Sequence, residues 1–251
     1  MKKIVPFLMS NAIAYSILSL MVYVFYGAVI GVSLMPSFCM IHACASAFGL
    51  SGGWPLLLLA LTLGLSVYVF FIAALMVFGL TERMLIRVMG FKPGRYSVDS
   101  GMFAAWLVYA GLHLIIVKTV LPLMVGTPWA KLFLRLLGCK IGKGVFINTN
   151  VLYDPYLLEL GDNVVLGGDC VINCHIFEGR EIILGKITIG ENTLISADAY
   201  ILPGATIGKN CNIGLRAVVR KNKVIPDHSV IMAVPGLPMK KVAGLTREGK
   251  T

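Results

Sequence analysis

Aliphatic residues recur at every sixth position through the C-terminal half of the chain. From residue 189 to residue 237 the series is unbroken, and the same phase appears in shorter blocks at 160–172 and 141–147. Neither an amphipathic helix nor an alternating strand has a period of six, so the pattern indicates a solenoid. The unbroken series consists of Ile189, Ile195, Ile201, Ile207, Ile213, Val219, Ile225, Ile231 and Leu237.

Each six-residue unit is expected to form one short strand and one turn, with three units closing a triangular coil. The aliphatic side chain would point into the prism, and a small residue four positions later, such as Cys170 or Cys211, would fit the narrowing corner. A glycine often follows the aliphatic residue, where we expect it to tolerate the backbone angles of the turn. Hydrogen bonds between neighbouring coils make the core continuous along the stack. The sequence therefore predicts an all-β, left-handed parallel β-helix.

The repeat slips twice. Thirteen residues separate Ile147 from Leu160, one too many for two units, and seventeen separate Ile172 from Ile189, one too few for three. The second slip is predicted to be a loop, residues 178–186, that leaves the prism. Projecting loops often carry function, so this break is the first place to look for a site.

The N-terminal half is too apolar for a soluble domain. Hydrophobic residues form 57% of the chain and charged residues only 14%, and the apolar excess lies before residue 129. The stretches 4–34 and 54–80 both exceed the roughly 20 residues that span a bilayer, and the first is too long for a signal peptide. Residues 36–53 are predicted to connect them as a loop. Cys39 and Cys44 could form a disulfide there if the loop faces an oxidising space.

Basic residues precede the first stretch and gather in residues 81–100. The positive-inside rule therefore places both regions in the cytoplasm. A third complete crossing by residues 102–125 would put the β-helix outside. Because this stretch contains His113 and Lys118, we interpret it as a re-entrant, hairpin-like or strongly tilted segment, with an ordinary third span as the alternative. We expect an integral membrane protein, of bacterial inner-membrane type, with membrane lipid as a partner and the β-helix in the cytoplasm.

A short helix is predicted between the two halves. Thr127 suits an N-cap, Pro128 the first helical position and Gly138 the position after the last turn. Trp129 suits the headgroup layer, so this helix is expected to lie at the membrane interface. The expected organisation is a membrane-embedded helical region at 1–126, a connecting helix at 127–138 and a β-helix domain with a C-terminal tail at 139–251.

Charge and cysteine spacing exclude some classes of function. The net charge of +10 is divided equally between the two halves and forms no basic-aromatic patch of the kind that reads nucleic acid. It favours anionic lipid or an anionic substrate instead. The six cysteines form no C-x-x-C pair, and His175 and His228 lack a third histidine nearby. A zinc site needs several such ligands, so we expect no metal.

Residues 141–237 resemble the hexapeptide-repeat acyltransferase superfamily. The segment 126–142, together with the run from His175 to Arg180, is similar to the membrane-linked β-helix region at the C-terminus of poly-lysine-synthetase-type non-ribosomal peptide synthetases. The resemblance implies a homotrimer whose active sites lie between adjacent subunits.

His175 is the best candidate for a catalytic base. It follows Ile172 by three positions, at an expected outward turn directly before the second slip. Acyl transfer from a thioester needs a base near neutral pKa, and the resemblance implies one such histidine. Glu178 is expected to orient His175, and Arg180 to bind a phosphate or the acceptor, although both could be solvated loop residues. The catalytic candidates are thus His175 and Glu178, and the substrate-binding candidates Arg180, Asn173 and His113.

Two other histidines need a separate interpretation. His228 has the same phase relative to Ile225 as His175 has to Ile172, but near the end of the stack a structural role is favoured. His113 lies in the membrane region, where ionisable groups are costly and often functional. It could contact a lipid-borne acceptor or pack against another segment.

Basic residues at 216–223 are expected to attract the phosphates of the acyl donor, although a basic face lying against the membrane is an alternative. The donor would be a coenzyme A thioester or phosphopantetheine on a carrier protein. Residues 233–238 resemble the closing G-x-P-A turn that lines the pantetheine slot in the superfamily. The donor-binding candidates are Ala197, Gly214, Arg216, Lys221, Pro235 and Lys240.

Three functions are compatible with these features. The leading hypothesis is an integral membrane acyltransferase that moves an acyl group from acyl-CoA to a hydroxyl or amine acceptor. The second is a carrier-protein-dependent enzyme that forms amide bonds between aminoacyl groups. The third is a non-catalytic trimeric membrane scaffold. Binding of acetyl-CoA, compared with binding of a phosphopantetheinylated carrier protein, separates them.

Overall fold

The computed structural model describes residues 12–49 and 51–233 and divides into two compact units. The first unit comprises Met1–Lys92 and Tyr96–Gly138, and the second comprises Pro93–Arg95 and Cys139–Thr251. A short piece of chain from within the helical region thus belongs to the β-helical unit.

In the described part of the first unit there are four α-helices: α2 (Ala12–Phe48), α3 (Gly53–Met89), α4 (Gly101–Thr119) and α5 (Pro128–Leu137). A 3-10 helix, Leu121–Leu123, follows α4. Among the described residues, three helical segments are long and apolar enough to cross a membrane: Ser19–Phe48, Gly53–Met89 and Gly101–Leu123.

The loop predicted at residues 36–53 is wrong, because α2 continues through Pro36 to Phe48. An internal proline is tolerated in apolar helices when other groups satisfy the backbone around it. Cys39 and Cys44 are both free and lie on this helix, so the suggested disulfide is not formed. Similarly, α3 extends past residue 80 and ends at Gly90, whose φ of +63° suits a glycine C-cap.

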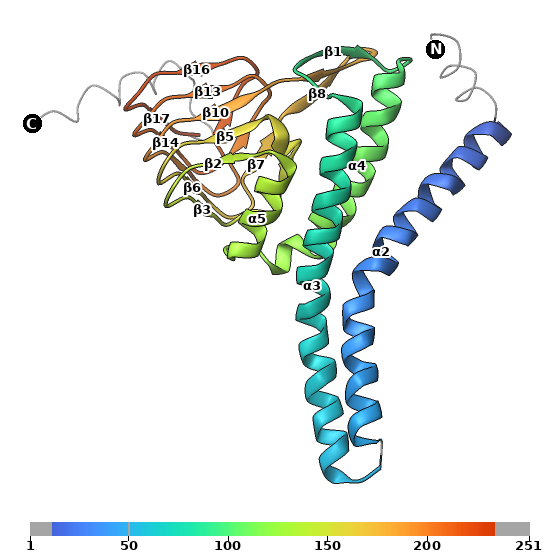
Figure 1. Ribbon diagram of the computed structural model, residues 1–251. Helices are drawn as coiled ribbons and strands as arrows, with labels where there is room; N and C mark the ends of the chain where they lie inside the picture. Colours follow the sequence, from blue (N-terminus) through green and yellow to red (C-terminus); the bar gives the residue numbers. More distant parts are fainter. Residues whose placement is uncertain (1–11, 50, 234–251) are drawn as a thin grey trace, which may run out of the picture. The chain divides into compact units, whose positions relative to one another are not determined.

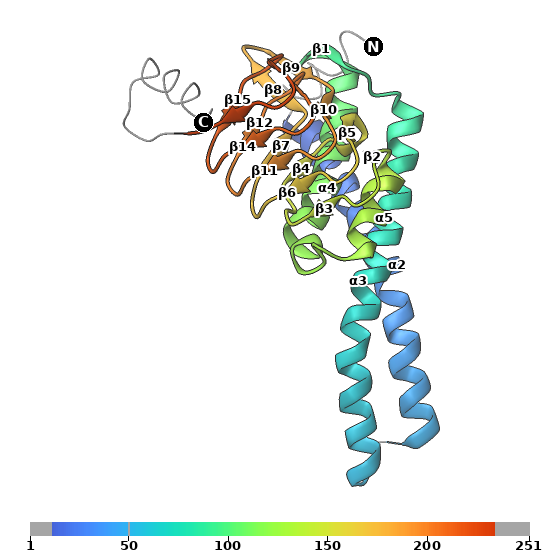
Figure 2. The same ribbon diagram turned by 90° about the vertical axis from the view of Figure 1, so that its left-hand side faces the viewer.

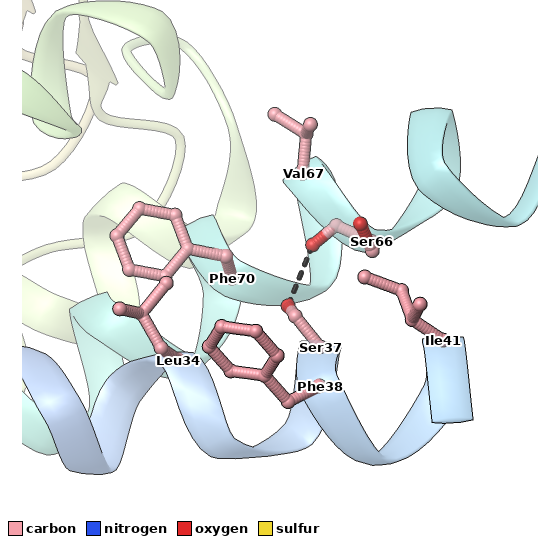
Figure 3. A pocket seen from close by; sticks show the side chains of 7 residues that line it. All are labelled: Leu34, Ser37, Phe38, Ile41, Ser66, Val67 and Phe70. Atoms are coloured by element: carbon pink, nitrogen blue, oxygen red, sulfur yellow. Dashed lines mark hydrogen bonds between the residues drawn. The ribbon is translucent and has the colours of Figure 1, made fainter. Parts of the chain in front are cut away.

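Helices α2 and α3 lie side by side over their lower halves (Figures 1 and 2). The Ser37 hydroxyl donates to the Ser66 carbonyl at 2.7 Å, which joins the two helices by a polar contact. Beside it lies an apolar crevice of about 200 Å³ (Figure 3). Its lining consists of Leu34, Ser37, Phe38, Ile41, Ser66, Val67 and Phe70.

The hairpin-like form predicted for residues 102–125 is also wrong, since α4 is one uninterrupted helix of 19 residues. Its N-cap is Ser100, whose hydroxyl accepts from the Phe103 backbone N–H. The predicted caps of α5 are confirmed. The Thr127 hydroxyl accepts from the Ala130 N–H at 3.3 Å, and Gly138 has a φ of +106°.

Up to residue 233, the second unit contains three parallel sheets, and successive coils of the chain stack in each (Figures 1 and 2). The first sheet contains β2 (Lys140–Ile141), β5 (Leu158–Leu160), β10 (Ile187–Ile189), β13 (Thr206–Ile207) and β16 (Val224–Ile225). The second contains β3 (Phe146–Ile147), β6 (Val165–Leu166), β11 (Leu194–Ile195), β14 (Asn212–Ile213) and β17 (Val230–Ile231). The third contains β4 (Leu152–Tyr153), β7 (Val171–Asn173), β12 (Tyr200–Ile201) and β15 (Val218–Val219).

The aliphatic residues of the repeat form the core of this prism. Ile189 pairs in register with Leu160 on one side and Ile207 on the other, and all three are buried. The left-handed β-helix is therefore confirmed. Ile231 is only partly buried, and Leu237 lies outside the residues that the structure describes.

Glycine is required after the aliphatic residue for a reason other than the one predicted from the sequence. None of these glycines has a positive φ; instead, a Cβ on Gly190 would lie 2.6 Å from the Gly208 carbonyl carbon in the next coil. The left-handed turn lies three positions after the aliphatic residue, where Asn and Asp adopt it most readily among non-glycine residues. The residues there with φ between 53° and 59° are Asn163, Asp169, Asn192, Asp198, Asn210, Arg216, Asn222 and His228.

The two slips of the repeat produce two local structures. At the first, Asp154 adopts a φ of +54° and a 3-10 helix, Pro155–Leu157, follows it. At the second, the predicted loop is instead an antiparallel hairpin of β8 (His175–Glu178) and β9 (Glu181–Leu184). The strand β1 (Gly94–Ser97) completes this sheet in the order β1-β9-β8.

Candidate active site

Asp154 and His175 meet in the second unit, one from each slip of the repeat. Asp154 follows β4, and its left-handed backbone turns the chain into the 3-10 helix. His175 is the first residue of β8 rather than a turn residue, which corrects the sequence-based prediction. The Nδ1 atom of His175 lies 2.6 Å from Oδ2 of Asp154.

The electrostatics of this pair set the proton positions on the imidazole. The Asp154 side chain is 2% exposed, whereas that of His175 is 18% exposed. A carboxylate can only accept a hydrogen bond, so Nδ1 of His175 carries a proton and donates a hydrogen bond to Asp154. In the neutral ring Nε2 is then the basic nitrogen. The Tyr156 hydroxyl donates to the second carboxylate oxygen of Asp154 at 3.3 Å.

Aromatic rings flank the imidazole. The ring centroids of Tyr153 and Phe177 lie 5.9 Å and 6.2 Å from that of His175, both in edge-to-face orientation. Phe177 is 49% exposed, so this wall of the site is open to a ligand. The amide oxygen of Asn173 accepts from the His175 backbone N–H at 3.4 Å, which places this predicted substrate-binding residue beside the base.

The cysteines near this region are poor nucleophiles. Burial and the nearby Asp154 charge raise the pKa of the Cys174 thiol well above its usual value. Burial likewise raises the pKa of Cys170 to about 12. Because a thiol attacks only as the thiolate, neither residue suits covalent catalysis. Within residues 12–49 and 51–233, no three His, Cys, Asp or Glu side chains are grouped as metal ligands.

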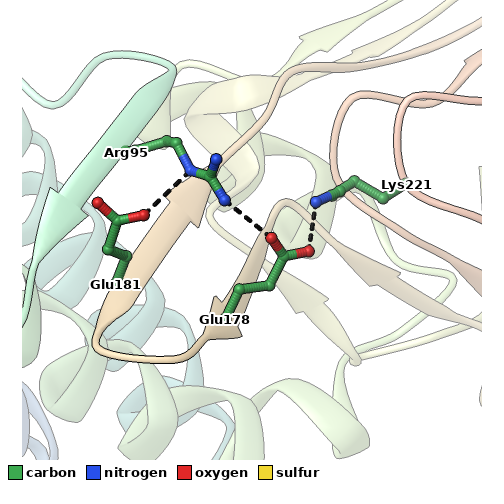
Figure 4. Close-up of polar contacts among 4 residues, drawn as sticks. All are labelled: Arg95, Glu178, Glu181 and Lys221. Atoms are coloured by element: carbon green, nitrogen blue, oxygen red, sulfur yellow. Dashed lines mark hydrogen bonds and ion pairs between the residues drawn. The ribbon is translucent and has the colours of Figure 1, made fainter.

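Glu178 does not orient His175 in this structure. Its carboxylate accepts from the Lys221 ammonium and, at 2.9 Å, from the Arg95 guanidinium (Figure 4). The hydrogen bond from Lys221, together with the Arg95 charge, lowers the pKa of Glu178. The carboxylate in contact with the His175 ring is that of Asp154, which the sequence-based prediction missed.

The other candidate residues lie at several places in the second unit. Arg180 is exposed at the turn between β8 and β9, next to Gly179. Ala197 and Gly214 occupy turns of successive coils, and Arg216 pairs with Asp198 at 3.5 Å. Lys221 pairs with Glu178, so two of the predicted phosphate-binding cations have carboxylate partners within the chain. Pro235 and Lys240 lie outside the described residues.

His113 packs inside the first unit, and its 2% exposure leaves no surface for the predicted acceptor contact. Its Nδ1 atom lies 2.7 Å from Oε2 of Glu82, which is completely buried. The imidazole stacks between the rings of Tyr109 and Phe133, at centroid distances of 5.7 Å and 6.2 Å. Of the two alternatives for His113, packing against another segment is the one observed.

Comparison with known proteins agrees with the architecture of the second unit. Residues 186–221 match the family described as bacterial transferase hexapeptide (six repeats). Delta-poly-L-ornithine synthetase of Acinetobacter baumannii is 28% identical over 113 residues, which cover 45% of this chain and 8% of that protein. Serine acetyltransferase of Staphylococcus aureus is 34% identical over 123 residues, covering 45% of this chain and 51% of that protein.

A third relative is matched over most of its length. The Bacillus subtilis protein YvoF, provisionally named an acetyltransferase, is 29% identical over 159 residues, covering 59% of this chain and 89% of YvoF. The chain spans only a small part of the synthetase and about half of the serine acetyltransferase. The resemblance noted from the repeats is confirmed, since residues 186–221 of the second unit match the hexapeptide-repeat transferase family.

Proposed function

We propose that this protein is an acyltransferase that moves an acyl group from a thioester donor to a hydroxyl or amine acceptor. The observation that carries the proposal is the contact between Nδ1 of His175 and the buried Asp154 carboxylate. An imidazole held in this way presents a basic nitrogen at a partly open site, as general-base catalysis requires. The acetyltransferases among the relatives support the same reaction class.

In this mechanism Nε2 of His175 takes the proton of the acceptor hydroxyl or amine while the acceptor attacks the thioester carbonyl. The tetrahedral intermediate then collapses, the carbon–sulfur bond breaks, and the imidazolium returns its proton to the leaving thiolate. Asp154 stabilises the imidazolium and keeps the proton on Nδ1 throughout. No atom of the protein becomes acylated.

The proposed donor is acyl-CoA. The basic side chains on the turns of the last coils, at 216–223, supply positive potential for its phosphates. A phosphopantetheinylated carrier protein is the second candidate, and the match to a poly-ornithine synthetase favours it. Thiol release from acetyl-CoA, measured with and without such a carrier, distinguishes the two donors.

A homotrimer is proposed from the family resemblance, and the outer surface of the prism supports it. Outward side chains of the second and third sheets include Phe146, Leu194, Tyr200 and Val218, all between 38% and 56% exposed. Those of the first sheet are mostly polar. A closed ring of three copies needs two different complementary patches on each subunit, as two apolar faces would provide. Native mass spectrometry of the detergent-solubilised protein tests this.

We also propose that α2 and α3 cross the bilayer and that α4 does not. The second unit contains Pro93–Arg95, before α4, and Cys139 onward, after α5. A bilayer cannot divide one folded unit, so the chain must cross it an even number of times between these segments. With ten residues, α5 is only about 15 Å long, too short to cross. This supports a re-entrant or strongly tilted α4 over an ordinary third span, and basic residues before α4 favour a cytoplasmic β-helix.

The test of the enzymatic proposal is acyl transfer by the purified full-length protein from acetyl-CoA to a set of hydroxyl and amine acceptors. We expect His175→Asn to abolish transfer. His228→Asn is the matched control, since His228 occupies a left-handed turn that asparagine tolerates. Full activity of the His175→Asn protein would overturn the assignment.

A further inference from the structure

The hairpin that carries His175 ends in two carboxylates that face each other. In the antiparallel register of β8 and β9, Glu178 pairs directly with Glu181. Like charges at directly opposed positions destabilise a strand pair. At this turn end of the hairpin, a cation is therefore needed to offset the repulsion between the two carboxylates.

Arg95 supplies that cation from a distant part of the chain (Figure 4). Its Nη2 atom lies 2.9 Å from Oε2 of Glu178, and its Nε atom lies 3.2 Å from Oε2 of Glu181. The planar guanidinium is suited to join two carboxylates in this way, which a lysine ammonium does less well. Lys221 contacts the remaining oxygen of Glu178 and connects the network to the coil after β15.

The strand β1 adds a second restraint. An isolated two-stranded hairpin is marginally stable in water, whereas a third strand makes a sheet that can persist. Because β1 lies on the outer edge of β9, the strand order β1-β9-β8 places β8 at the opposite edge. Residue Arg95 is part of β1, so one segment provides both the strand pairing and the bridging cation.

The position of β8 matters for the reaction. Alternate residues of a strand point to the same side, so His175 and Phe177 share one face of β8. Their rings pack edge to face at 6.2 Å between centroids, so the base contacts the exposed aromatic side chain that forms one wall of the site. A displacement of the turn end of β8, at Glu178, would move the adjacent Phe177 and loosen the backbone back to His175.

We propose that Arg95 is a positioning residue for the acyl-transfer site, holding β8 through Glu178 and Glu181 so that His175 and Phe177 keep the reactive arrangement. This role rests on the proposed acyltransferase function. It makes the segment between α3 and α4 a structural part of the site. The same network accounts for Glu178, which the sequence had suggested as the orienting acid.

The test compares Arg95→Ala with Lys209→Ala in the full-length protein. Lys209 is a matched control because its ion pair with Glu191 has the same 2.9 Å distance and similar exposure, 56% and 43% against 57% and 39% for Arg95 and Glu178. We expect hydrogen exchange of residues 175–184 to accelerate only in Arg95→Ala. We expect kcat to fall about tenfold in that variant, with the donor KM within about twofold. Arg95→Lys should recover part of the loss.

Salt provides a further readout. Raising the ionic strength from about 0.05 M to about 1 M shortens the screening length to about 3 Å and should lower the kcat of the wild type toward that of Arg95→Ala. The kcat of the variant itself should respond less. A purely structural ion pair would change the thermal midpoint without this convergence.

Two results would overturn the proposal: unchanged exchange in residues 175–184 of Arg95→Ala, or accelerated exchange with kcat unchanged. Failure of the enzymatic proposal is recognised separately. If His175→Asn retained full activity, the acyltransfer mechanism would be wrong, while the exchange data would still decide whether Arg95 holds the hairpin.

Discussion

The Nδ1 atom of His175 lies 2.6 Å from Oδ2 of Asp154, although the two residues are separated by more than one full coil of the prism. Asp154 is buried and His175 is partly exposed, so the acid is protected from water while part of the imidazole side chain remains accessible. The pair depends on two departures from the six-residue repeat. The first places Asp154 before a 3-10 helix, and the second places His175 at the start of β8.

Replacing Asp154 by asparagine tests this relationship directly. The amide can donate to Nδ1 and stabilise the tautomer whose proton sits on Nε2, which cannot act as a base. We expect kcat to fall by roughly 10²- to 10⁴-fold with little change in donor KM. The measurement is steady-state transfer from acetyl-CoA.

The control for that variant is Asp169→Asn. Asp169 has the same left-handed backbone, with a φ of 54° for both residues, and asparagine fits it equally well. A fall in kcat of similar size in both variants would show that the loss at residue 154 comes from the turn and not from the imidazole.

The β-helix could be predicted from the sequence because its order is local. Each aliphatic residue is buried by its own repeat unit and by the neighbouring coils, so the period of six is sufficient evidence. The hairpin was less visible, although short apolar runs on both sides of Gly179-Arg180 are a hairpin signal. Residues 178–186 looked like a loop because they broke the period.

The partner of His175 could not be found by the same reasoning. The extra residue between Ile147 and Leu160 was apparent, but nothing in the neighbouring sequence shows which part of another coil it contacts. One signal was present: Asp154-Pro155 combines a residue that tolerates a left-handed backbone with one that starts a 3-10 turn. The strand β1 was invisible for a related reason, since its partner β9 lies far along the chain.

Gly190 is predicted to be essential for coil stacking rather than for a turn. A Cβ there would meet the Gly208 carbonyl carbon at 2.6 Å, and backbone of the next coil cannot move aside cheaply. We expect Gly190→Ala to destabilise the protein by about 1–3 kcal/mol. Thermal unfolding, followed by circular dichroism, measures the change.

Gly168→Ala serves as the comparison for Gly190→Ala. A Cβ on Gly168 would be 3.7 Å from the Asn148 amide nitrogen, an ordinary van der Waals distance, and its φ is not positive. Equal unfolding midpoints for the two variants would contradict the close-approach explanation.

Glu159 should contribute a pH-dependent part of the stability of the prism. Hydrogen bonds from Lys140 and Lys186, at 2.5 Å and 2.7 Å, lower the pKa of Glu159. A lowered acid pKa stabilises the fold above the ordinary glutamate pKa, and the contribution is lost as pH falls through the lowered value.

We therefore expect Glu159→Gln to lose about 0.2–1 kcal/mol of stability at neutral pH, and the loss to vanish in acid. Thermal midpoints of wild type and variant across the acid range provide the measurement. A difference that stays constant from neutral to strongly acidic pH would mean that the carboxylate charge is not responsible.

We propose that the β-helix lies on the same side of the membrane as the segment before α4, because Pro93–Arg95 belongs to the second unit. If α2 and α3 cross and α4 does not, the C-terminus and the segment before α4 are both cytoplasmic, whereas residues 49–52 between α2 and α3 face the other side.

We expect a C-terminal green fluorescent protein to fluoresce in bacterial cells and a C-terminal alkaline phosphatase to be inactive. Phosphatase inserted after Ser51 should be active and serves as the internal control. An active C-terminal phosphatase would mean that α4 completes a third crossing, which would require Arg95 to lie apart from Glu178 and Glu181.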